Sequence, residues 1–169
     1  MLNAARKDGQ SVTARGDLLT RNRIDGVVLA ELRPVPTKSG ATIEIFRADG
    51  PFQGFQVRQT NYCPLRASYT TDWHMHRQQN DVVVPVLGEV SVGLYDDRED
   101  SPTYKTSLML RVSPLRMAAV YIPCGVWHAL RNDGVHDGAY VVFTDRMYVH
   151  EDPDDWRLLR DEPALRGIL

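Results

Sequence analysis

The chain is poor in cysteine and has no long apolar run. It holds only two cysteines, Cys63 and Cys124, which are too few for a disulfide framework and do not form a CxxC pair. No apolar run approaches the roughly 18 residues that a membrane-spanning helix needs. The length of 169 residues corresponds to one domain, large enough to bury a core without staples. We therefore expect one soluble domain with both thiols reduced.

The chain also lacks an excess of charge of one sign. Twenty Lys and Arg stand against 22 Asp and Glu, a formal net charge of −2, which gives no basic footprint for nucleic acid. The first residues, MLNAARKDGQSVTARGD, have no apolar stretch of the kind found in signal peptides. The sequence thus predicts a cytoplasmic protein with neither a nucleic-acid nor a membrane partner.

Short apolar or alternating runs, separated by Pro, Gly or Asp, dominate the chain from Val27 onward. Their lengths and their content of Val, Ile, Tyr and Phe are typical of β-strands. In one run, Val90, Val92 and Leu94 recur at every second position, which places them on one face of a strand. Many short strands predict an all-β sandwich or barrel, with the antiparallel jelly roll favoured. The runs cover residues 27–32, 41–46, 54–59, 81–87, 89–95, 107–112, 118–122 and 139–143.

The two ends of the chain differ from this pattern. Residues 1–24 are mostly polar and predict a weakly ordered arm, followed by the jelly-roll domain over residues 25–150. Residues 151–169 contain two prolines and predict a tail with one short helix around Asp155–Arg160.

A first cluster of chemically useful side chains is His74-Met75-His76, followed by Asp81 and Gly88. On a strand, positions i and i+2 face the same side, so His74 and His76 should project together. A short turn could bring the Asp81 carboxylate back to the same place. An isolated pair of this kind could equally be two exposed strand histidines.

A second cluster, Pro123-x-Gly125-x-x-His128-x-x-x-Asn132, lies about fifty residues further along the chain. Its Pro and Gly predict a tight turn that delivers His128 at the start of a strand. Three imidazoles and the Asp81 carboxylate would make a ligand set for a divalent metal such as Fe, Mn, Ni or Zn. No organic cofactor is expected.

The two clusters resemble the paired motifs of the cupin superfamily, HxH-x(3,4)-E-x(6)-G and PxGxxHxxxN, with Asp81 where the pattern has Glu. Within that superfamily, GEVSVGLYDDREDSPTYKT (88–106) resembles the GEV-x-DVAVDLR-x-SPTFG stretch of dTDP-4-dehydrorhamnose 3,5-epimerases. SGATIEIFR (39–47) and YIPCGVWHAL (121–130) resemble two further segments of that family, and YVHEDPDDWRL (148–158) resembles a less studied branch. The resemblance implies a cupin double-stranded β-helix, or jelly-roll barrel, with the ligand in its mouth, and a homodimer.

Residues at other family positions differ in this chain. Counting from Gln59 and Asn61 places the family's base on His74. The family's Lys becomes Asp81, and its proton-donating Tyr becomes Val142 when Tyr148 is matched to the second family tyrosine. Its two phosphate-binding arginines become Ser39 and Thr71. Because bidentate Arg–phosphate contacts are strong, these changes predict weak binding of dTDP.

The function that these residues favour is epimerisation or isomerisation of a keto-sugar or related carbonyl compound, with His74 as base and His128 as the second catalytic histidine. A first alternative is a metal-dependent cupin enzyme of another class, a dioxygenase or an isomerase, which uses His74, His76, Asp81 and His128. A second is a non-catalytic binder of sugars or other small ligands. Trp73 and Trp127 each precede a key histidine and should pack on the opposite face. Substrate-binding positions in the barrel mouth are predicted at Arg58, Arg66, Tyr121 and Tyr140.

Overall fold

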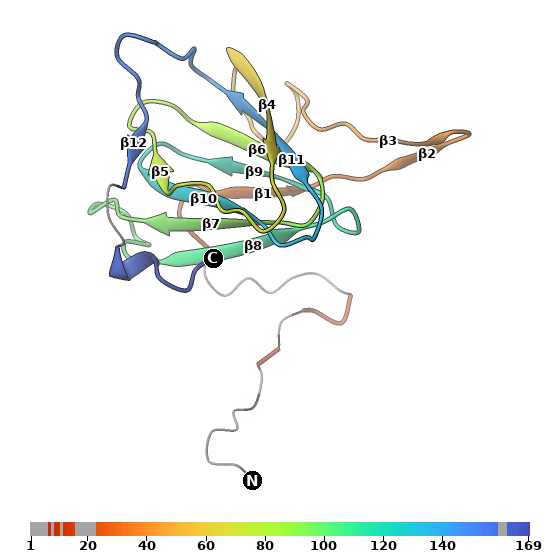
Figure 1. Cartoon of the computed structure of the whole chain (residues 1–169), viewed down its shortest axis with the longest axis horizontal. Helices are drawn as coiled ribbons and strands as arrows, with labels where there is room; N and C mark the ends of the chain where they lie inside the picture. Colours follow the sequence, from red (N-terminus) through yellow and green to blue (C-terminus); the bar gives the residue numbers. More distant parts are fainter. Residues whose placement is uncertain (1–6, 8, 11, 16–22, 159–161) are drawn as a thin grey trace.

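Two antiparallel five-stranded sheets face each other and enclose the core of the protein (Figure 1). The computed structural model describes residues 7, 9–10, 12–15, 23–158 and 162–169. The first sheet has the order β1 (Val28–Glu31), β9 (Ala118–Ile122), β6 (Asp81–Leu87), β11 (Gly138–Thr144) and β4 (Gln59–Leu65). The second has the order β12 (Trp156–Arg157), β5 (His74–Met75), β10 (Val126–Asn132), β7 (Val90–Asp96) and β8 (Ser107–Val112). The predicted all-β jelly-roll fold is confirmed.

The alternation of β7 explains how the core forms between the sheets. Val90, Val92 and Leu94 are 1%, 0% and 0% exposed and pack with inward-facing residues of β6, β8, β9 and β10. Strand β6 is apolar on both faces because Val83 joins this core while Val82 and Val84 face outward into a second cluster. Side chains of the segment before β4 cover that outer face, so β6 is buried on both sides.

That covering segment corrects two strand predictions. The run 41–46 is a strand only to Thr42, where β3 (Gly40–Thr42) ends its hairpin with β2 (Val35–Thr37). The run 54–59 is irregular until Gln59. Instead of pairing, Phe46, Phe52 and Phe55 pack as a loop on the outer face of the first sheet. Strand β4 then extends to Leu65; its Pro64 is tolerated because β4 lies at a sheet edge.

The ends of the chain also differ from the expectation. Most of residues 1–24 lies outside the described residues, but Ile24 is 1% exposed and belongs to the core, so the domain includes it. The helix expected around Asp155–Arg160 is wrong where the chain is described, because Trp156 and Arg157 form β12 beside β5; residues 159–161 lie outside the described part. A single 3-10 turn, Pro163–Leu165, follows, with the Glu162 side chain as its cap.

The C-terminal residues pack on the outer face of the second sheet. Leu165 and Ile168 form a third apolar cluster with Tyr95, against which Trp73 and Trp127 pack. The predicted packing role of the two tryptophans is therefore confirmed, and their neighbours His74 and His128 face the barrel interior. Within the described residues, no helix is long and apolar enough to cross a membrane.

Candidate active site

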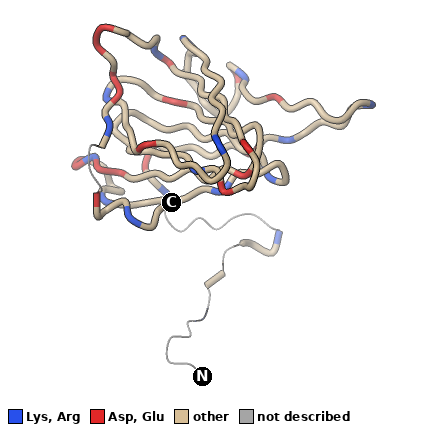
Figure 2. Tube along the Cα trace, viewed as in Figure 1, with Lys and Arg blue, Asp and Glu red and all other residues tan. Residues whose placement is uncertain are grey.

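A cavity of about 370 Å³ opens between the two sheets at the end of the barrel where β5 lies. Strands of both sheets line it, together with residues of the segment that joins β11 to β12. Figure 2 shows acidic residues gathered in that segment. The cavity is lined by Gln59, Asn61, Cys63, His74, His76, Gln78, Gln79, Asp81, Val83, His128, Leu130, Tyr140, Val142, Thr144, Arg146, Met147, Tyr148, Val149, Asp152, Asp154, Asp155 and Arg157.

Three histidine rings converge in this cavity, as the sequence predicts. His74 in β5 is the cross-strand partner of His128 in β10, and their ring centroids are 4.1 Å apart. His76 follows β5 and lies 5.5 Å from the His74 ring and 5.7 Å from the His128 ring. One ring nitrogen of each histidine lies within 4.8 Å of the others, so the three could hold a metal ion.

The backbone fixes how the three rings present their nitrogens. Each Nδ1 atom faces a carbonyl oxygen, which can only accept a hydrogen bond, so each Nδ1 carries the proton and donates it. In the neutral ring, Nε2 then holds a lone pair. The carbonyl partners are Asp72 for His74 (3.0 Å), Val126 for His128 (3.1 Å) and Asp154 for His76.

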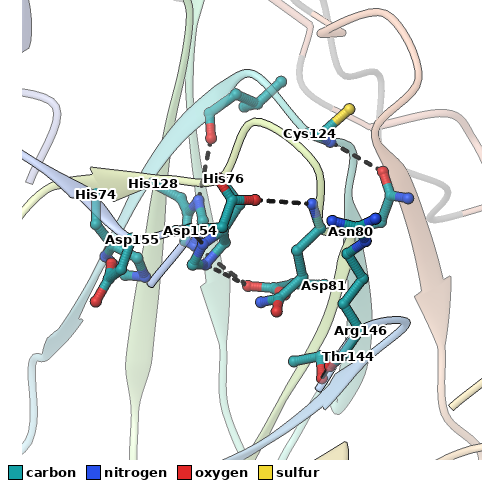
Figure 3. Close-up of polar contacts among 12 residues, drawn as sticks. His74, His76, Asn80, Asp81, Cys124, His128, Thr144, Arg146, Asp154 and Asp155 are labelled. Carbon is teal, nitrogen blue, oxygen red and sulfur yellow. Dashed lines mark hydrogen bonds and ion pairs between the residues drawn. The ribbon is translucent and has the colours of Figure 1, made fainter. Parts of the chain in front are cut away.

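Asp81, at the start of β6, places a buried carboxylate against two of these rings (Figure 3). Its Oδ2 atom lies 3.3 Å from Nε2 of His76 and 3.5 Å from Nε2 of His128, and Gln79 Nε2 donates to Oδ1 at 2.8 Å. Burial alone would raise the pKa of this carboxyl, but its contacts with His128 and His76 hold the pKa well below the usual range. Asp81 is therefore an anion at neutral pH.

The surroundings of His74 and His76 shift the pKa values of the two rings in opposite directions. Burial, together with the neighbouring His128, lowers the pKa of His74 to about 3, so this ring is neutral at pH 7. Burial also opposes charge on His76, but the hydrogen bond and the charge of Asp81 outweigh it and raise the pKa of His76 to about 9. One ring is thus able to accept a proton, while the other forms an ion pair.

The segment after β11 contributes cavity-lining residues in a part of the chain that was predicted to be a tail. Asp154 and Asp155 line the cavity, and Asp155 lies beside His74 (Figure 3). Asp155 Oδ2 accepts from Arg157 at 2.7 Å, whereas its Oδ1 is buried without a hydrogen-bond partner among the described residues. Only the acidic run DPDD signalled these positions, and such a run is more often a solvated turn.

The structure places only one of the four predicted substrate-binding residues in the cavity. Tyr140 lines the cavity from β11. Tyr121 does not, because Val120 and Ile122 face the core and the alternation of β9 turns Tyr121 outward against Phe52 and Phe55. Arg58 and Arg66, at the two ends of β4, are exposed and do not line the cavity either. The expectation that these three residues line the barrel mouth is therefore wrong.

The remaining motif residues shape the scaffold. Gly125 has φ +82° and its N–H donates to the His76 carbonyl at 2.7 Å, so the Pro-x-Gly turn holds the loop that carries His76. At the other end of β10, Asn132 is fully buried and donates to the Leu65 and His136 carbonyls at 3.1 and 2.8 Å. Gly125 thus ties the start of β10 to the segment that carries His76, and Asn132 ties the end of β10 to the end of β4 and to the turn before β11.

Comparison with known proteins gives a consistent result. The family described as dTDP-4-dehydrorhamnose 3,5-epimerase matches residues 21–165. The probable low-salt glycan biosynthesis epimerase Agl13 of Haloferax volcanii is 28% identical over 139 residues, which cover 82% of this chain and 89% of that protein. The spore coat polysaccharide biosynthesis protein SpsL of Bacillus subtilis is 27% identical over 142 residues, which cover 84% and 93%.

A solved structure shares the fold. The dTDP sugar isomerase of Desulfovibrio desulfuricans G20 superposes with a TM-score of 0.77 at 24% identity, over 85% of this chain and 90% of that one. Since the family match spans most of the sequence, the chain belongs to the dTDP-4-dehydrorhamnose 3,5-epimerase family, a family of nucleotide-sugar epimerases with a cupin-like fold.

Proposed function

We propose that this epimerase inverts or isomerises a keto-sugar at a carbon next to the carbonyl, with His74 Nε2 as the base. The observation that carries the proposal is the hydrogen bond between His74 Nδ1 and the Asp72 carbonyl at 3.0 Å. It places the proton of the neutral ring on Nδ1 and leaves a lone pair on Nε2, the atom that can accept a proton from carbon.

In this reaction His74 Nε2 takes the proton, and the electron pair of the broken C–H bond forms the C=C bond of an enolate. Negative charge develops on the former carbonyl oxygen. Return of a proton to the opposite face of the same carbon inverts it. Tyr140 supports that second step, because it lines the cavity from the first sheet while His74 projects from the second. Burial raises the pKa of Tyr140, so its hydroxyl stays protonated until it donates. Tyr140 then takes up a proton from solvent and His74 Nε2 releases one to solvent, which restores both groups.

A second candidate function is metal-dependent catalysis. A divalent metal, Fe, Mn, Ni or Zn, would be held by His74, His76, His128 and Asp81. The residues fit such an ion, because His128 Nε2 is buried without a hydrogen-bond partner among the described residues, and histidine ligands commonly donate Nδ1–H to a carbonyl. When bound, the metal would act as a Lewis acid on the substrate oxygen. His74 Nε2 cannot bind a metal and accept a proton at the same time, so the two candidates exclude each other at this atom.

The charges of the cavity bear on the substrate. Besides His76, Arg146 and Arg157 are the cationic side chains among the described lining residues, and Arg157 is engaged by Asp155 at 2.7 Å and Asp72 at 3.6 Å. The exposed Ser39, which stands where the family has a phosphate-binding Arg, is not among the cavity-lining residues. This supports a site that selects the sugar ring and its carbonyl more than the nucleotide diphosphate.

We also propose that the protein is a homodimer. The hairpin β2–β3 projects from the barrel (Figure 1), and every residue of its two strands is exposed, including Val35 at 61%. An isolated two-stranded hairpin is marginal in water, so a second copy is the expected packing partner. Sedimentation equilibrium should give twice the monomer mass, and deletion of residues 35–42 should give a monomer; a monomeric full-length chain would contradict the proposal.

The activity is tested by incubating the protein in D2O with a dTDP-linked 4-keto sugar and, separately, with the free keto-sugar. The epimerase should introduce deuterium at the carbon next to the carbonyl, detected by mass spectrometry and NMR. A non-catalytic binder would leave both compounds unlabelled. Elemental analysis of protein purified without a metal-affinity tag then separates the metal-free enzyme from the metal-dependent one.

A further inference from the structure

We propose that Asp154 is a positioning residue that sets the orientation of the His76 ring. The inference deepens the proposed function, because it concerns how the same site is held in place. Asp154 follows His76 by 78 residues and reaches it from the segment that precedes β12 (Figure 3). Its carboxylate and its carbonyl both contact the segment that carries His76.

The carboxylate of Asp154 accepts hydrogen bonds from three consecutive backbone N–H groups. Its Oδ1 accepts from Arg77 N at 3.0 Å, and its Oδ2 accepts from Gln78 N at 2.7 Å and Gln79 N at 3.2 Å. Charge-assisted bonds of this kind are stronger than neutral ones, and they satisfy N–H groups that no strand pairs. These bonds therefore fix the turn that leaves His76.

The carbonyl of the same residue accepts the hydrogen bond from His76 Nδ1. One residue thus anchors the backbone after His76 and also accepts the Nδ1–H of the ring, which fixes the direction in which the ring points. Among the three histidines, His74 and His128 bond to carbonyls two residues away on their own segments. Only the ring of His76 is oriented by a residue that is distant in sequence.

Trp156 and its own contacts help to keep Asp154 in place. Trp156 Nε1 donates to its Oδ1 at 3.3 Å, and Trp156 pairs with Met75 across β12 and β5. The Arg77 guanidinium lies 3.7 Å from the centroid of the Trp156 ring, a cation–π contact. The residues 154–157 therefore form a strap across the edge of β5.

The experiment uses long-range ¹H–¹⁵N spectra of the histidine rings in the full chain without added metal. Asp154→Ala removes the carboxylate but keeps the carbonyl. If the carboxylate positions that carbonyl, the His76 ring-nitrogen signals should shift toward those of a ring without a fixed Nδ1 bond, while those of His128 stay unchanged. Asp137→Ala is the matched control, since Asp137 also accepts a backbone N–H, from Ala67 at 3.0 Å, but does not line the cavity.

Asp154→Asn keeps one acceptor oxygen without the charge and should give a smaller shift, which provides the rescue expected of a positioning role. It also serves if Asp154→Ala fails to fold, as judged by its melting curve. Wild-type His76 signals in a folded Asp154→Ala protein would overturn the inference; if that variant does not fold, wild-type signals in Asp154→Asn would overturn it. The readout does not depend on turnover, so an inactive wild-type protein would contradict the proposed function and leave this inference standing.

Discussion

His74 and His128 are directly opposed on neighbouring antiparallel strands, with ring centroids 4.1 Å apart. Sheet hydrogen bonding, not a free loop, therefore fixes the relative position of the two rings. Strand β5 has only two residues and is held by β10 on one edge and β12 on the other. The C-terminal segment is thus part of the structure that positions the proposed base.

The metal candidate makes a prediction about Asp81. If Fe, Mn, Ni or Zn binds, wild-type protein at a metal concentration 100 times Kd should gain about 2.7 kcal/mol of stability. Asp81→Ala removes a carboxylate that lies 3.3 and 3.5 Å from two ring nitrogens, so its metal occupancy and its melting-temperature gain should both fall. Calorimetric scans with each metal measure this. A wild-type melting temperature that no metal changes would eliminate the candidate.

Binding of the nucleotide is predicted to be weak. Ser39 and Thr71 stand where the family has phosphate-binding arginines, and Thr71 Oγ1 instead accepts a backbone bond from Leu130 N at 2.9 Å. Isothermal titration with dTDP should therefore show no binding at micromolar concentrations. Micromolar or tighter binding would show that other cavity groups, with Arg146 the first to substitute, replace those arginines.

The loop after β7 should make stability depend on pH. Asp96 is fully buried and accepts bonds from Arg98, Ser101 and Thr103 at 2.6–3.1 Å. Burial raises the pKa of this carboxyl, but these bonds prevail and lower it well below the usual range. Because the pKa of Asp96 is lower in the folded state, its ionised carboxylate stabilises the fold at pH values above the unfolded-state pKa of about 4. This stabilisation is lost as the pH falls toward the folded-state pKa.

Asp96→Asn should therefore cost roughly 3 kcal/mol of unfolding free energy at pH 7 and less at pH 3. Urea unfolding at the two pH values measures the difference. An equal loss at both would mean that the charge of Asp96 contributes nothing.

Two glycines with the same backbone conformation offer a test of packing at the β6–β7 turn. Gly88 and Gly54 have φ of +80° and +81°, but a Cβ on Gly88 would lie 3.1 Å from Gly138 Cα, whereas nothing lies within 4 Å at Gly54. Gly54→Ala should cost about 1 kcal/mol from the left-handed conformation alone. Gly88→Ala should cost at least about 1 kcal/mol more, because backbone must move. Equal losses in urea unfolding would contradict this packing.

Much of the fold was predictable because local pattern and tertiary packing agree. The runs 81–87, 107–112 and 118–122 are strands with the predicted bounds. Segment 41–46 failed because Phe46 packs as a loop side chain, a long-range contact that no local period records. The predicted run 54–59 missed β4 for a related reason. Pairing with β11 decides which residues form the strand, and Pro64 makes that strand hard to recognise from the sequence.

The site was predictable where a motif carried it. His74, His76 and His128 converge as their spacing indicates, and Asp81 contacts two of them. The contribution of Asp154 could not be predicted, because it depends on the pairing of β12 with β5 across about eighty residues of chain.

The proposed mechanism has His74 remove a proton from carbon. Its most direct test is the rate of deuterium incorporation into the keto-sugar by His74→Gln, compared with His136→Gln, which changes an exposed histidine outside the cavity. Loss of a positioned general base should lower the rate by about 10²–10⁴-fold, while His136→Gln keeps the wild-type rate. Wild-type incorporation by a folded His74→Gln protein would show that His74 is not the base.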